Sequence, residues 1–460
     1  MLNTWMQRLA TGVRARDARF DGLFFTAVRT TRIFCRPVCP AKTPLRKNIE
    51  FFENAAAAQA AGYRPCLRCR PEVSPGLPAW GGTSSTVSRA LRLIDGGALD
   101  EGSTEDLAAR MGVTDRHLRR LFLEHVGVPP VVVGQTRRIL FAKKLITETS
   151  LPFSEIAFAS GFTSLRRFNE ALRATYRRNP KQLRRWSRPE QPKQPDVRLK
   201  LYYRPPYNWD AFVRFVESRA IAGLEEVDAS GYRRPGIDVR PCGDEHCLIA
   251  RIGGGDANGL RAVADRIRFL FDLRANTQEI GKHLSKFPLL GRIVAKRPGL
   301  RLPGSWDPFE LAVRAILGQQ VSVKGASTLA ARMVAKFGAP DAKVYADADI
   351  ASIGLPKARA ESIRAFARAM AGGEIRFDEA VSSTELIGRM CELRGIGPWT
   401  ANYIAMRALA DPDAFPAADL GLLKASGAAS AARLEEMAEA WRPWRAYAAM
   451  YLWETLRERD

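Results

Sequence analysis

Apolar residues recur at helical intervals in two similar stretches in the first half of the chain. The first, residues 104–125, starts at Thr104, which can cap a helix, and Gly112 then opens a short turn into a second, basic helix. The pattern returns 49 to 50 residues later, and the matching positions are Gly112 and Gly161, Phe122 and Leu172, and Pro130 and Pro180. Two tandem helix-turn-helix units are therefore predicted, with helix packing unrelated to DNA as the alternative.

Strand-like alternation of apolar and polar residues follows at residues 197–203, 236–241 and 247–253, and from about residue 257 onward the periodicity is helical. Residues 71–85 and 187–196 are rich in Pro and polar or small residues, which is typical of exposed linkers.

These patterns predict a multidomain α+β protein with a small cysteine-bearing α/β domain and an all-α double helix-turn-helix domain. A small antiparallel β-sheet subdomain and a larger α-helical domain follow. The predicted boundaries are 1–75, 86–186, 197–256 and 257–460.

The chain carries 71 Lys and Arg against 49 Asp and Glu, a formal net charge of +22. The excess is +8 in residues 1–83, +8 in 84–190 and +6 in 191–460. This spread favours one extended polyanion, and double-stranded DNA is the leading candidate because binding releases its counterions. A basic composition that only aids solubility is the alternative.

A hydrophobic fraction of 46% excludes a mainly disordered chain. No apolar run approaches the roughly 18 residues of a membrane span, and the first residues lack the apolar stretch of a signal peptide. We therefore expect a cytoplasmic protein with no membrane partner.

Four of the seven cysteines, Cys35, Cys39, Cys66 and Cys69, form two close pairs separated by 26 residues. Such pairs can deliver four thiolates to one tetrahedral Zn²⁺. Two disulfides are the alternative, which a chain without an export signal makes less favourable. Many Arg and Lys residues surround the cluster, so a purely structural zinc knuckle that grips phosphate also fits.

The stretch TTRIFCRPVCPAKTPLRKNIEFF, followed by AAGYRPCLRCRP, resembles the N-terminal domain of the Ada alkylation-response proteins over about residues 15–73. The resemblance implies that Cys35 is both a zinc ligand and an irreversible methyl acceptor for a DNA methylphosphotriester. Cys39, Cys66 and Cys69 would complete the zinc site. Methylation would lower the formal charge of the cluster from about −2 to about −1, and so raise its affinity for DNA.

Residues 86–186 resemble the AraC-type DNA-binding domain, which follows the zinc domain in Ada proteins. By analogy, one recognition helix would present Arg116, His117 and Arg120, and the other Ser164, Arg166 and Arg167. The activator role that Ada proteins have would make RNA polymerase a further partner, and we expect a monomer.

The string LRGIGPWTA at 393–401 places two glycines between helical patterns, which permits a tight hairpin whose N–H groups meet a phosphate. An ordinary interhelical turn is the alternative. Asp419 follows Trp399 by 20 residues and could simply cap the helix that begins near Leu420. Aromatic residues gather in this part of the chain: Trp399, Tyr403, Trp441, Trp444, Tyr447, Tyr451 and Trp453. Beside one carboxylate, such rings suit an electron-poor or cationic flat ligand, although some must be plain packing.

Residues 199–457 resemble the helix-hairpin-helix DNA glycosylases of the AlkA type, which release 3-methyladenine. The shared motifs are LYYRPPYNWDAF, FDLRAN, RPGLRLPGSWDPFELAVRAILGQQVSV, LRGIGPWTANYIAMRA and AWRPWRAYAAMYLW. The resemblance implies that Asp419 is the catalytic carboxylate. It further implies a base pocket of Trp399, Tyr403, Phe215 and Trp453, Gln319 near the lesion, and DNA contacts at Gly395, Gly397 and Thr400.

Two positions depart from the best-known AlkA protein. Gln320 stands where that protein has a leucine wedge, although a glutamine could still fill the gap left by an extruded base. Asp419 stands alone where that protein has two adjacent aspartates.

The resemblance implies hydrolysis of the N-glycosidic bond of alkylated bases without a cofactor. Relatives that also cut the DNA strand carry a lysine at the position of Trp399. Without that amine, no lyase activity is expected. The Pro-Cys-His-Arg motif of a guanine methyltransferase is absent. Two alternatives are a regulator whose C-terminal domain only binds DNA, and a glycosylase whose front half, with a structural zinc, only targets DNA.

Overall fold

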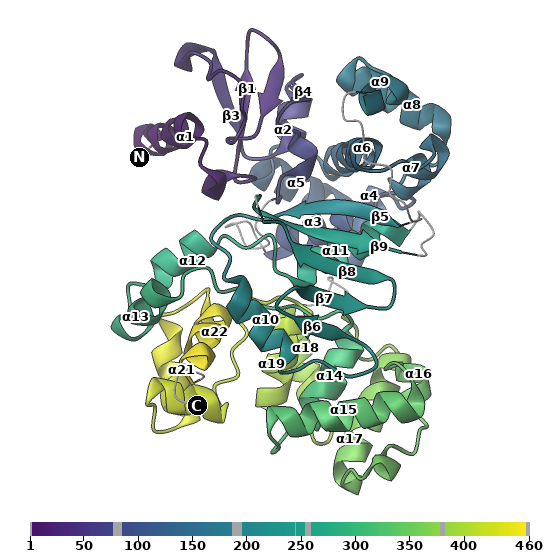
Figure 1. Cartoon of the computed structure of the whole chain (residues 1–460), viewed down its shortest axis with the longest axis vertical. Helices are drawn as coiled ribbons and strands as arrows, with labels where there is room; N and C mark the ends of the chain where they lie inside the picture. The colour runs from purple at the N-terminus through teal and green to yellow at the C-terminus, as the bar shows by residue number, and fades with distance from the viewer. Residues whose placement is uncertain are drawn as a thin grey trace. The chain divides into compact units, whose positions relative to one another are not determined.

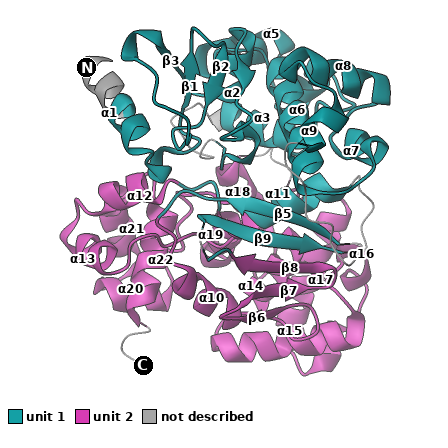
Figure 2. Cartoon of the chain, turned by 45° about the horizontal axis from the view of Figure 1, so that its top comes forward, with its two compact units in different colours: residues 1–205, 242–268, 273–275 teal, residues 206–241, 269–272, 276–460 magenta. Residues whose placement is uncertain are grey.

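The computed structural model describes residues 2–76, 85–185, 196–243, 245–253, 259–377 and 382–456. The chain forms two compact units (Figure 2). The first comprises residues 1–205, 242–268 and 273–275, and the second residues 206–241, 269–272 and 276–460. Figure 1 labels the helices and strands. Most of both predicted linkers, at 77–84 and 186–195, lies outside the described residues.

The first unit begins with helix α1 (Leu2–Ala15) and a four-stranded sheet in the order β3-β1-β2-β4. The strands are β1 (Phe25–Val28), β2 (Ile33–Cys35), β3 (Ile49–Phe52) and β4 (Arg64–Pro65). Helix α2 (Ala55–Ala60) packs on this sheet around the buried ring of Phe34. Strands β2 and β4 pair in parallel, with Phe34 beside Pro65. The next residue on each side, Cys35 and Cys66, therefore lies next to the other.

The start of the first predicted linker is not exposed. Residues Pro71–Val73 form the short 3-10 helix η3, and all three side chains are buried. Glu72 accepts a hydrogen bond from Lys143 at 3.1 Å, so a long-range ion pair draws this segment into the unit. The expectation of an exposed linker is therefore wrong for these residues.

The helical part of the first unit confirms the predicted repeat. Gly112 and Gly161 open equivalent turns, with φ of +67° and +83°. Phe122 and Leu172 are both fully buried, and Pro130 and Pro180 each begin a helix. The helices are α3 (Ser85–Asp95), α4 (Thr104–Arg110), α5 (Asp115–His125), α6 (Pro130–Glu148), α7 (Phe153–Ala159), α8 (Leu165–Tyr176) and α9 (Pro180–Arg185).

The cap of α4 lies one residue before the predicted Thr104. The Ser103 hydroxyl accepts from the Asp106 N–H, and the Asp106 carboxylate accepts from the Ser103 N–H, which forms a reciprocal capping box.

Glu148, at the end of α6, joins three segments of the first unit through buried charges. It accepts from Arg70 at 2.6 Å, from Lys144 at 3.0 Å and from the Lys200 N–H at 3.1 Å. Burial lowers the pKa of Lys144 to about 8. Burial acts to raise the pKa of Glu148, but the charges of Lys144 and Arg70 outweigh it and lower that pKa. Lys200 lies in β5 (Val197–Tyr202), which pairs antiparallel with β9 (Cys247–Ile252) as the alternation predicted.

The second unit contains a β-meander of β6 (Glu226–Asp228), β7 (Gly231–Arg234) and β8 (Ile237–Pro241). The pattern predicted β8 but missed β6 and β7, which are short. The chain's remaining helices are α10 (Trp209–Glu217), α11 (Leu260–Leu270), α12 (Thr277–Leu284), α13 (Pro288–Lys296), α14 (Pro308–Leu317), α15 (Val323–Phe337), α16 (Ala342–Tyr345), α17 (Lys357–Ala371), α18 (Ser383–Glu392), α19 (Pro398–Ala408), α20 (Leu420–Ser426), α21 (Ala431–Glu439) and α22 (Arg445–Leu456).

Helix α14 is buried along nearly its whole length and packs against α15, α17 and α19, while α22 packs against α13 and α20. These contacts hold the ends of α14, α19, α20 and α22 in fixed positions, and residues at these ends line a cavity. Among the described residues, no helix combines the length and apolar character that crossing a membrane requires.

The Glu148 cluster generates a stability prediction. Replacing Glu148 by alanine leaves the ammonium of Lys144 without its carboxylate partner, and the Lys144 side chain is only 1% exposed. Loss of one partner of a buried ion pair costs about 3–5 kcal/mol. The urea midpoint of the first unit, followed by circular dichroism, should fall accordingly. Glu170→Ala is the matched control, because its ion pair with Arg166 on α8 is exposed and should contribute below about 1 kcal/mol. Equal midpoints for the two variants would contradict this assignment.

Candidate functional sites

The four front cysteines come together as predicted. The Sγ atoms of all four lie within 4.8 Å of one another: Cys35, Cys39, Cys66 and Cys69. Tetrahedral zinc with Zn–S bonds of about 2.3 Å needs sulfurs about 3.8 Å apart, so small side-chain shifts would complete the site. The donor set therefore fits Zn²⁺, and each of these cysteines is a free thiol rather than half of a disulfide.

The four sulfurs are not equivalent. Cys66 and Cys69 are buried, whereas Cys35 and Cys39 are partly exposed. The Arg36 N–H donates to the Cys69 sulfur at 3.3 Å, and the Arg68 N–H donates to the Cys66 sulfur at 3.4 Å. A backbone hydrogen bond from Ala41 also reaches Cys39. Within the described residues no backbone N–H donates to the Cys35 sulfur. Cys35 therefore differs from the other three sulfurs in receiving no backbone hydrogen bond from the described residues.

Not every arginine near the cluster faces solvent. Arg36 is buried, pairs with Asp21 through its Nε at 2.9 Å and donates to the Cys69 carbonyl at 3.1 Å. Arg32 donates to the Ala61 carbonyl and lies over the Tyr63 ring. Arg36 therefore holds the fold around the cysteines, whereas Arg32 is exposed and packs on the tyrosine ring.

The predicted recognition helices are α5 and α8. Arg116 and Arg120 are exposed on α5, and an Arg120 nitrogen lies 3.1 Å from His117 Nδ1. On α8, Arg166 and Arg167 are exposed, and Arg166 pairs with Glu170. Ser164 caps α8 by accepting from the Arg167 N–H at 3.2 Å, so its oxygen has a structural role at the start of the helix.

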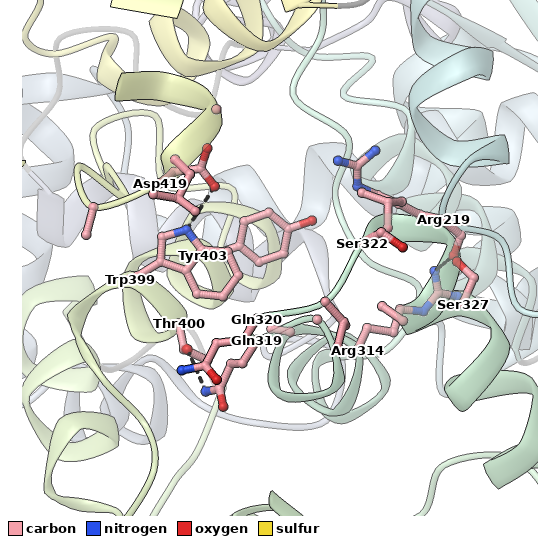
Figure 3. Close-up of a pocket in the computed structure, with 18 of the residues that line it drawn as sticks. Arg219, Arg314, Gln319, Gln320, Ser322, Ser327, Trp399, Thr400, Tyr403 and Asp419 are labelled. Carbon is pink, nitrogen blue, oxygen red and sulfur yellow. Dashed lines mark hydrogen bonds between the residues drawn. The ribbon is translucent and has the colours of Figure 1, made fainter. Parts of the chain in front are cut away.

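In the second unit, a cavity of about 870 Å³ opens between the ends of α14, α19, α20 and α22 (Figure 3). Its lining brings together most of the predicted glycosylase residues: Gln319, Gln320, Gly395, Gly397, Trp399, Thr400, Tyr403, Asp419 and Trp453. Among the described residues of that lining, Asp419 is the only acidic one.

Asp419 is held by three donors. The Trp399 Nε1–H donates to Oδ2 at 3.0 Å, and the Trp453 Nε1–H donates to Oδ1 at 2.9 Å. The Leu422 N–H donates to Oδ1 at 3.0 Å, which makes Asp419 the cap of α20. The helix-cap interpretation is thus correct, and it is compatible with a catalytic role because the same bonds fix the carboxylate at the cavity wall.

The aromatic residues divide into a cavity wall and a packed core. Trp399 and Tyr403 stack at 5.7 Å and 13°, and Trp453 meets Tyr403 edge-on at 6.2 Å. Phe215 does not line the cavity and instead lies behind the wall, 6.3 Å from Trp453. The remaining predicted rings, Trp441, Trp444, Tyr447 and Tyr451, are buried in packing.

The hairpin between α18 and α19 is fixed by Gln319. Its side-chain amide donates to the Gly395 carbonyl at 2.9 Å and to the Thr400 hydroxyl at 3.0 Å. The Thr400 side chain is only 2% exposed, and its contact with DNA stays a prediction. Gly395 has φ of +84°, and a Cβ there would lie 2.0 Å from the Ser362 hydroxyl, so only glycine fits. Gly395 itself is exposed, and Gly397 is partly exposed at the start of α19.

Gln320 lies at the exposed rim of the cavity, in a left-handed conformation with φ of +57°. The rim also carries apolar side chains that sequence reasoning missed. Val321, Val323 and Leu420 all line the cavity and are exposed, Leu420 by 82%. Exposed apolar residues beside a cavity are typical of a surface that binds a partner.

Two arginines of the cavity were also missed. The Arg407 guanidinium donates to the Tyr403 hydroxyl at 3.0 Å and lies 5.2 Å from the Phe215 ring centre. Arg219 lies over the same ring at 3.9 Å. Burial acts to raise the pKa of Tyr403, but the charges of Arg407 and Arg219 outweigh it and lower that pKa. Arg407 falls near the end of the motif LRGIGPWTANYIAMRA. Nothing in the spacing of that motif indicated that Arg407 would line the cavity.

Comparison with known proteins assigns the parts of the chain. Four family models match in order: the metal binding domain of Ada (residues 9–72), a helix-turn-helix domain (107–185), the AlkA N-terminal domain (198–307) and the HhH-GPD superfamily of base excision DNA repair proteins (313–446). A Mycobacterium tuberculosis protein described as a probable bifunctional transcriptional activator/DNA repair enzyme AlkA is 38% identical over 98% of this chain and 96% of its own. This chain belongs to the Ada–AlkA family.

Two Escherichia coli proteins each match one part of the Ada–AlkA chain. DNA-3-methyladenine glycosylase 2 is 32% identical over 55% of this chain and 96% of its own length. The bifunctional transcriptional activator/DNA repair enzyme Ada is 42% identical over 27% of this chain and 34% of its own length. The cysteine cluster lies in the Ada part of this Ada–AlkA chain, and Asp419 lies in the part matched by the base excision repair superfamily.

Proposed function

We propose that the chain is a DNA alkylation-repair and regulatory protein with two chemistries. Its second unit hydrolyses the N-glycosidic bond of alkylated bases of the 3-methyladenine type. Its first unit accepts methyl groups from DNA methylphosphotriesters on Cys35 and activates transcription of repair genes. The observation that carries the enzymatic part is the single carboxylate, Asp419, held by two indoles on the wall of an aromatic cavity.

The proposed hydrolysis begins when the damaged nucleotide rotates out of the duplex into the cavity. The base lies against the rings of Trp399 and Tyr403, and Gln320 occupies the gap left in the stack. The C1′–N bond breaks with its electron pair on the base, and Asp419 stabilises the positive charge that develops on the sugar. Asp419 also orients the water whose oxygen bonds to C1′, and the proton that this water loses passes to solvent. No cofactor is required in this scheme.

Contacts to the DNA backbone would come from the α18–α19 hairpin. Gly395 and Gly397 present backbone N–H groups beside the cavity, and the N-terminus of α19 adds a favourable dipole for a phosphate. Gln319 and Thr400 hold this hairpin in place, and both line the cavity, where Gln319 would lie near the lesion.

We expect Asp419→Asn to lower base release from alkylated duplex DNA by at least about a hundredfold, because the amide cannot stabilise positive charge. The measurement is single-turnover release of 7-methylguanine, with DNA affinity measured alongside to separate binding from chemistry. Asp413→Asn is the matched control, because that carboxylate pairs with Arg445 and does not line the cavity. Equal rates for Asp419→Asn and the wild type would reject the assignment.

The enzyme is proposed to release the base without cutting the strand. A lyase forms a Schiff base through an amine, and none of the described residues that line the cavity is a lysine. Efficient β-elimination on an abasic duplex would contradict this part of the proposal.

In the first unit, Cys35 is the proposed methyl acceptor and also one of four zinc ligands. Bound zinc would keep the four sulfurs deprotonated at neutral pH. The Cys35 sulfur attacks the methyl carbon of the phosphotriester, and the methyl C–O bond breaks with its electron pair on the phosphate oxygen. Cys35 is suited to this step because it is partly exposed and its sulfur receives no backbone N–H within the described residues.

Methylation removes one negative charge from the cluster, which lowers its repulsion from DNA phosphates. We propose that this change raises DNA affinity and thereby switches transcription through α5 and α8, with RNA polymerase as the downstream partner of a monomeric activator.

Incubation with methylated DNA should add about 14 Da to the chain, on the peptide that contains Cys35. The measurement is mass spectrometry of the zinc-loaded protein, with the metal quantified. We expect one zinc per chain in the wild type and in Cys391→Ser, a control at an exposed thiol outside the cluster. Cys69→Ser should lose zinc. A wild type that binds zinc but gains no mass would favour a structural zinc in a DNA-targeting domain.

A further inference from the structure

Strand β5 belongs to the glycosylase part of the sequence but to the first unit of the structure. The glycosylase part begins at residue 198, where the match to the AlkA N-terminal domain starts. Figure 2 shows β5 in the colour of the first unit, which also contains the cysteine domain (residues 9–76), matched over 9–72 by the Ada model. Two residues at and beyond the end of β5 contact the cysteine domain.

Arg204, two residues beyond β5, is buried against the cysteine domain. It is only 1% exposed, and its Nη1 donates to the Asp21 carbonyl at 3.0 Å and to the Gly76 carbonyl at 2.7 Å. Its Nη2 donates to the Arg274 carbonyl, within the glycosylase part. Asp21 precedes the four cysteines in the sequence and Gly76 follows them. One guanidinium therefore ties together the two segments that flank the cysteines.

Gly22, next to Asp21, leaves room for this arginine. Its φ is +76°, and a Cβ there would lie 3.0 Å from the Gly76 carbonyl oxygen and 3.1 Å from Arg204 Nη1. Both distances are shorter than ordinary van der Waals contact, so a residue without a side chain is needed here. The cysteine domain is thus shaped around a side chain that comes from the glycosylase part.

Asp21 and Arg36 connect Arg204 to the cysteine cluster. The Asp21 carboxylate accepts from Arg36 Nε at 2.9 Å, and both side chains are buried. Arg36 directly follows Cys35. Its N–H donates to the Cys69 sulfur at 3.3 Å, and its guanidinium donates to the Cys69 carbonyl at 3.1 Å. Contacts therefore run from Arg204 through Asp21 and Arg36 to the sulfur of a zinc ligand.

A second residue of the glycosylase part lies against this ion pair. The ring centre of Tyr202, the last residue of β5, lies 5.3 Å from the guanidinium carbon of Arg36. The ring adds a cation–π contact, and it helps to shield the pair of Arg36 and Asp21 from water. The end of β5 thus supports the ion pair from two positions.

We infer that the glycosylase part of the chain completes the zinc site. Arg204 is a positioning residue that holds Asp21 and Arg36, and through them the sulfur of Cys69, in the arrangement that binds the metal. Because coupling between two binding events is reciprocal, zinc binding in turn stabilises the packing of β5 on the cysteine domain. The inference goes beyond the proposed function, since it holds whether or not Cys35 accepts a methyl group.

The test measures the affinity of the full chain for Zn²⁺ by competition with a chromophoric chelator. Arg204→Met keeps an unbranched side chain and removes its hydrogen-bond donors. We expect the zinc affinity of this variant to fall by about 10- to 100-fold, which is typical when a group that supports a metal ligand is lost. Arg204→Lys retains a charged donor and should restore part of the affinity.

Arg301→Met is the matched control. Arg301 is also buried, at 2% exposed, and donates to the Asp272 carbonyl at 2.8 Å, but it belongs to the second unit. Its replacement removes a comparable set of buried hydrogen bonds, so the zinc affinity should stay at the wild-type value. Circular dichroism checks that each variant is folded.

Hydrogen–deuterium exchange of the wild type, with zinc and after its removal, tests the reciprocal effect. We expect the backbone N–H groups of β5 to exchange at least about tenfold faster without zinc, because the packing of this strand then loses the stabilisation that zinc supplies. The N–H groups of β7 and β8, in the second unit, should keep their rates. This measurement decides the question if Arg204→Met does not fold.

A wild-type zinc affinity in folded Arg204→Met would overturn the inference, and so would exchange of β5 that does not depend on zinc. An equal loss of zinc affinity in Arg301→Met would also overturn it, because the effect would then be general destabilisation. Failure of methyl transfer to Cys35 would reject that part of the proposed function and leave this inference intact.

Discussion

The hydrogen bonds from two indoles to one carboxylate are the interaction on which the second unit's chemistry depends. Trp399 lies on α19 and Trp453 on α22, and both donate to Asp419 at the start of α20. These three helices must therefore be packed in their final positions before the carboxylate is fixed. The same indoles supply part of the aromatic wall, so in the proposed mechanism one set of residues serves both charge stabilisation and base stacking.

The two sites solve opposite electrostatic problems. In the first unit, four sulfurs that would carry clustered negative charge on zinc must approach a polyanion, and backbone N–H groups donate to the sulfurs of Cys69 and Cys66. In the second unit, the proposed mechanism has one carboxylate, Asp419, facing the positive charge that develops on the sugar, and the buried cation Arg407 donates to Tyr403 in the wall of the same cavity.

Local sequence patterns were sufficient for features that neighbouring residues determine. The cysteine spacing, the repeat marked by Gly112 and Gly161, and the cap at Asp419 all follow from short-range geometry, and the structure contains each of them. Family resemblance, rather than pattern, supplied the roles of Asp419 and Cys35.

Contacts between residues far apart in the sequence could not be predicted from local patterns. The burial of Arg36 against Asp21 and of Glu72 against Lys143 depends on partners 15 and 71 residues away. Thr400 was expected at the DNA surface, but its side chain is buried and accepts a hydrogen bond from Gln319, which follows α14 in the chain. Arg407 had no signal in the sequence, because its partners are the carbonyls of a distant loop.

The most direct test of the central claim replaces Trp453 by phenylalanine, which keeps an aromatic ring and removes the N–H that donates to Asp419 Oδ1. Single-turnover release of 7-methylguanine and affinity for the same duplex are measured together. The account predicts a rate at least about tenfold lower with little change in affinity, because the carboxylate loses a fixed donor while stacking remains. A wild-type rate in this variant would contradict the claim that the indole N–H groups of Trp399 and Trp453 position the catalytic carboxylate.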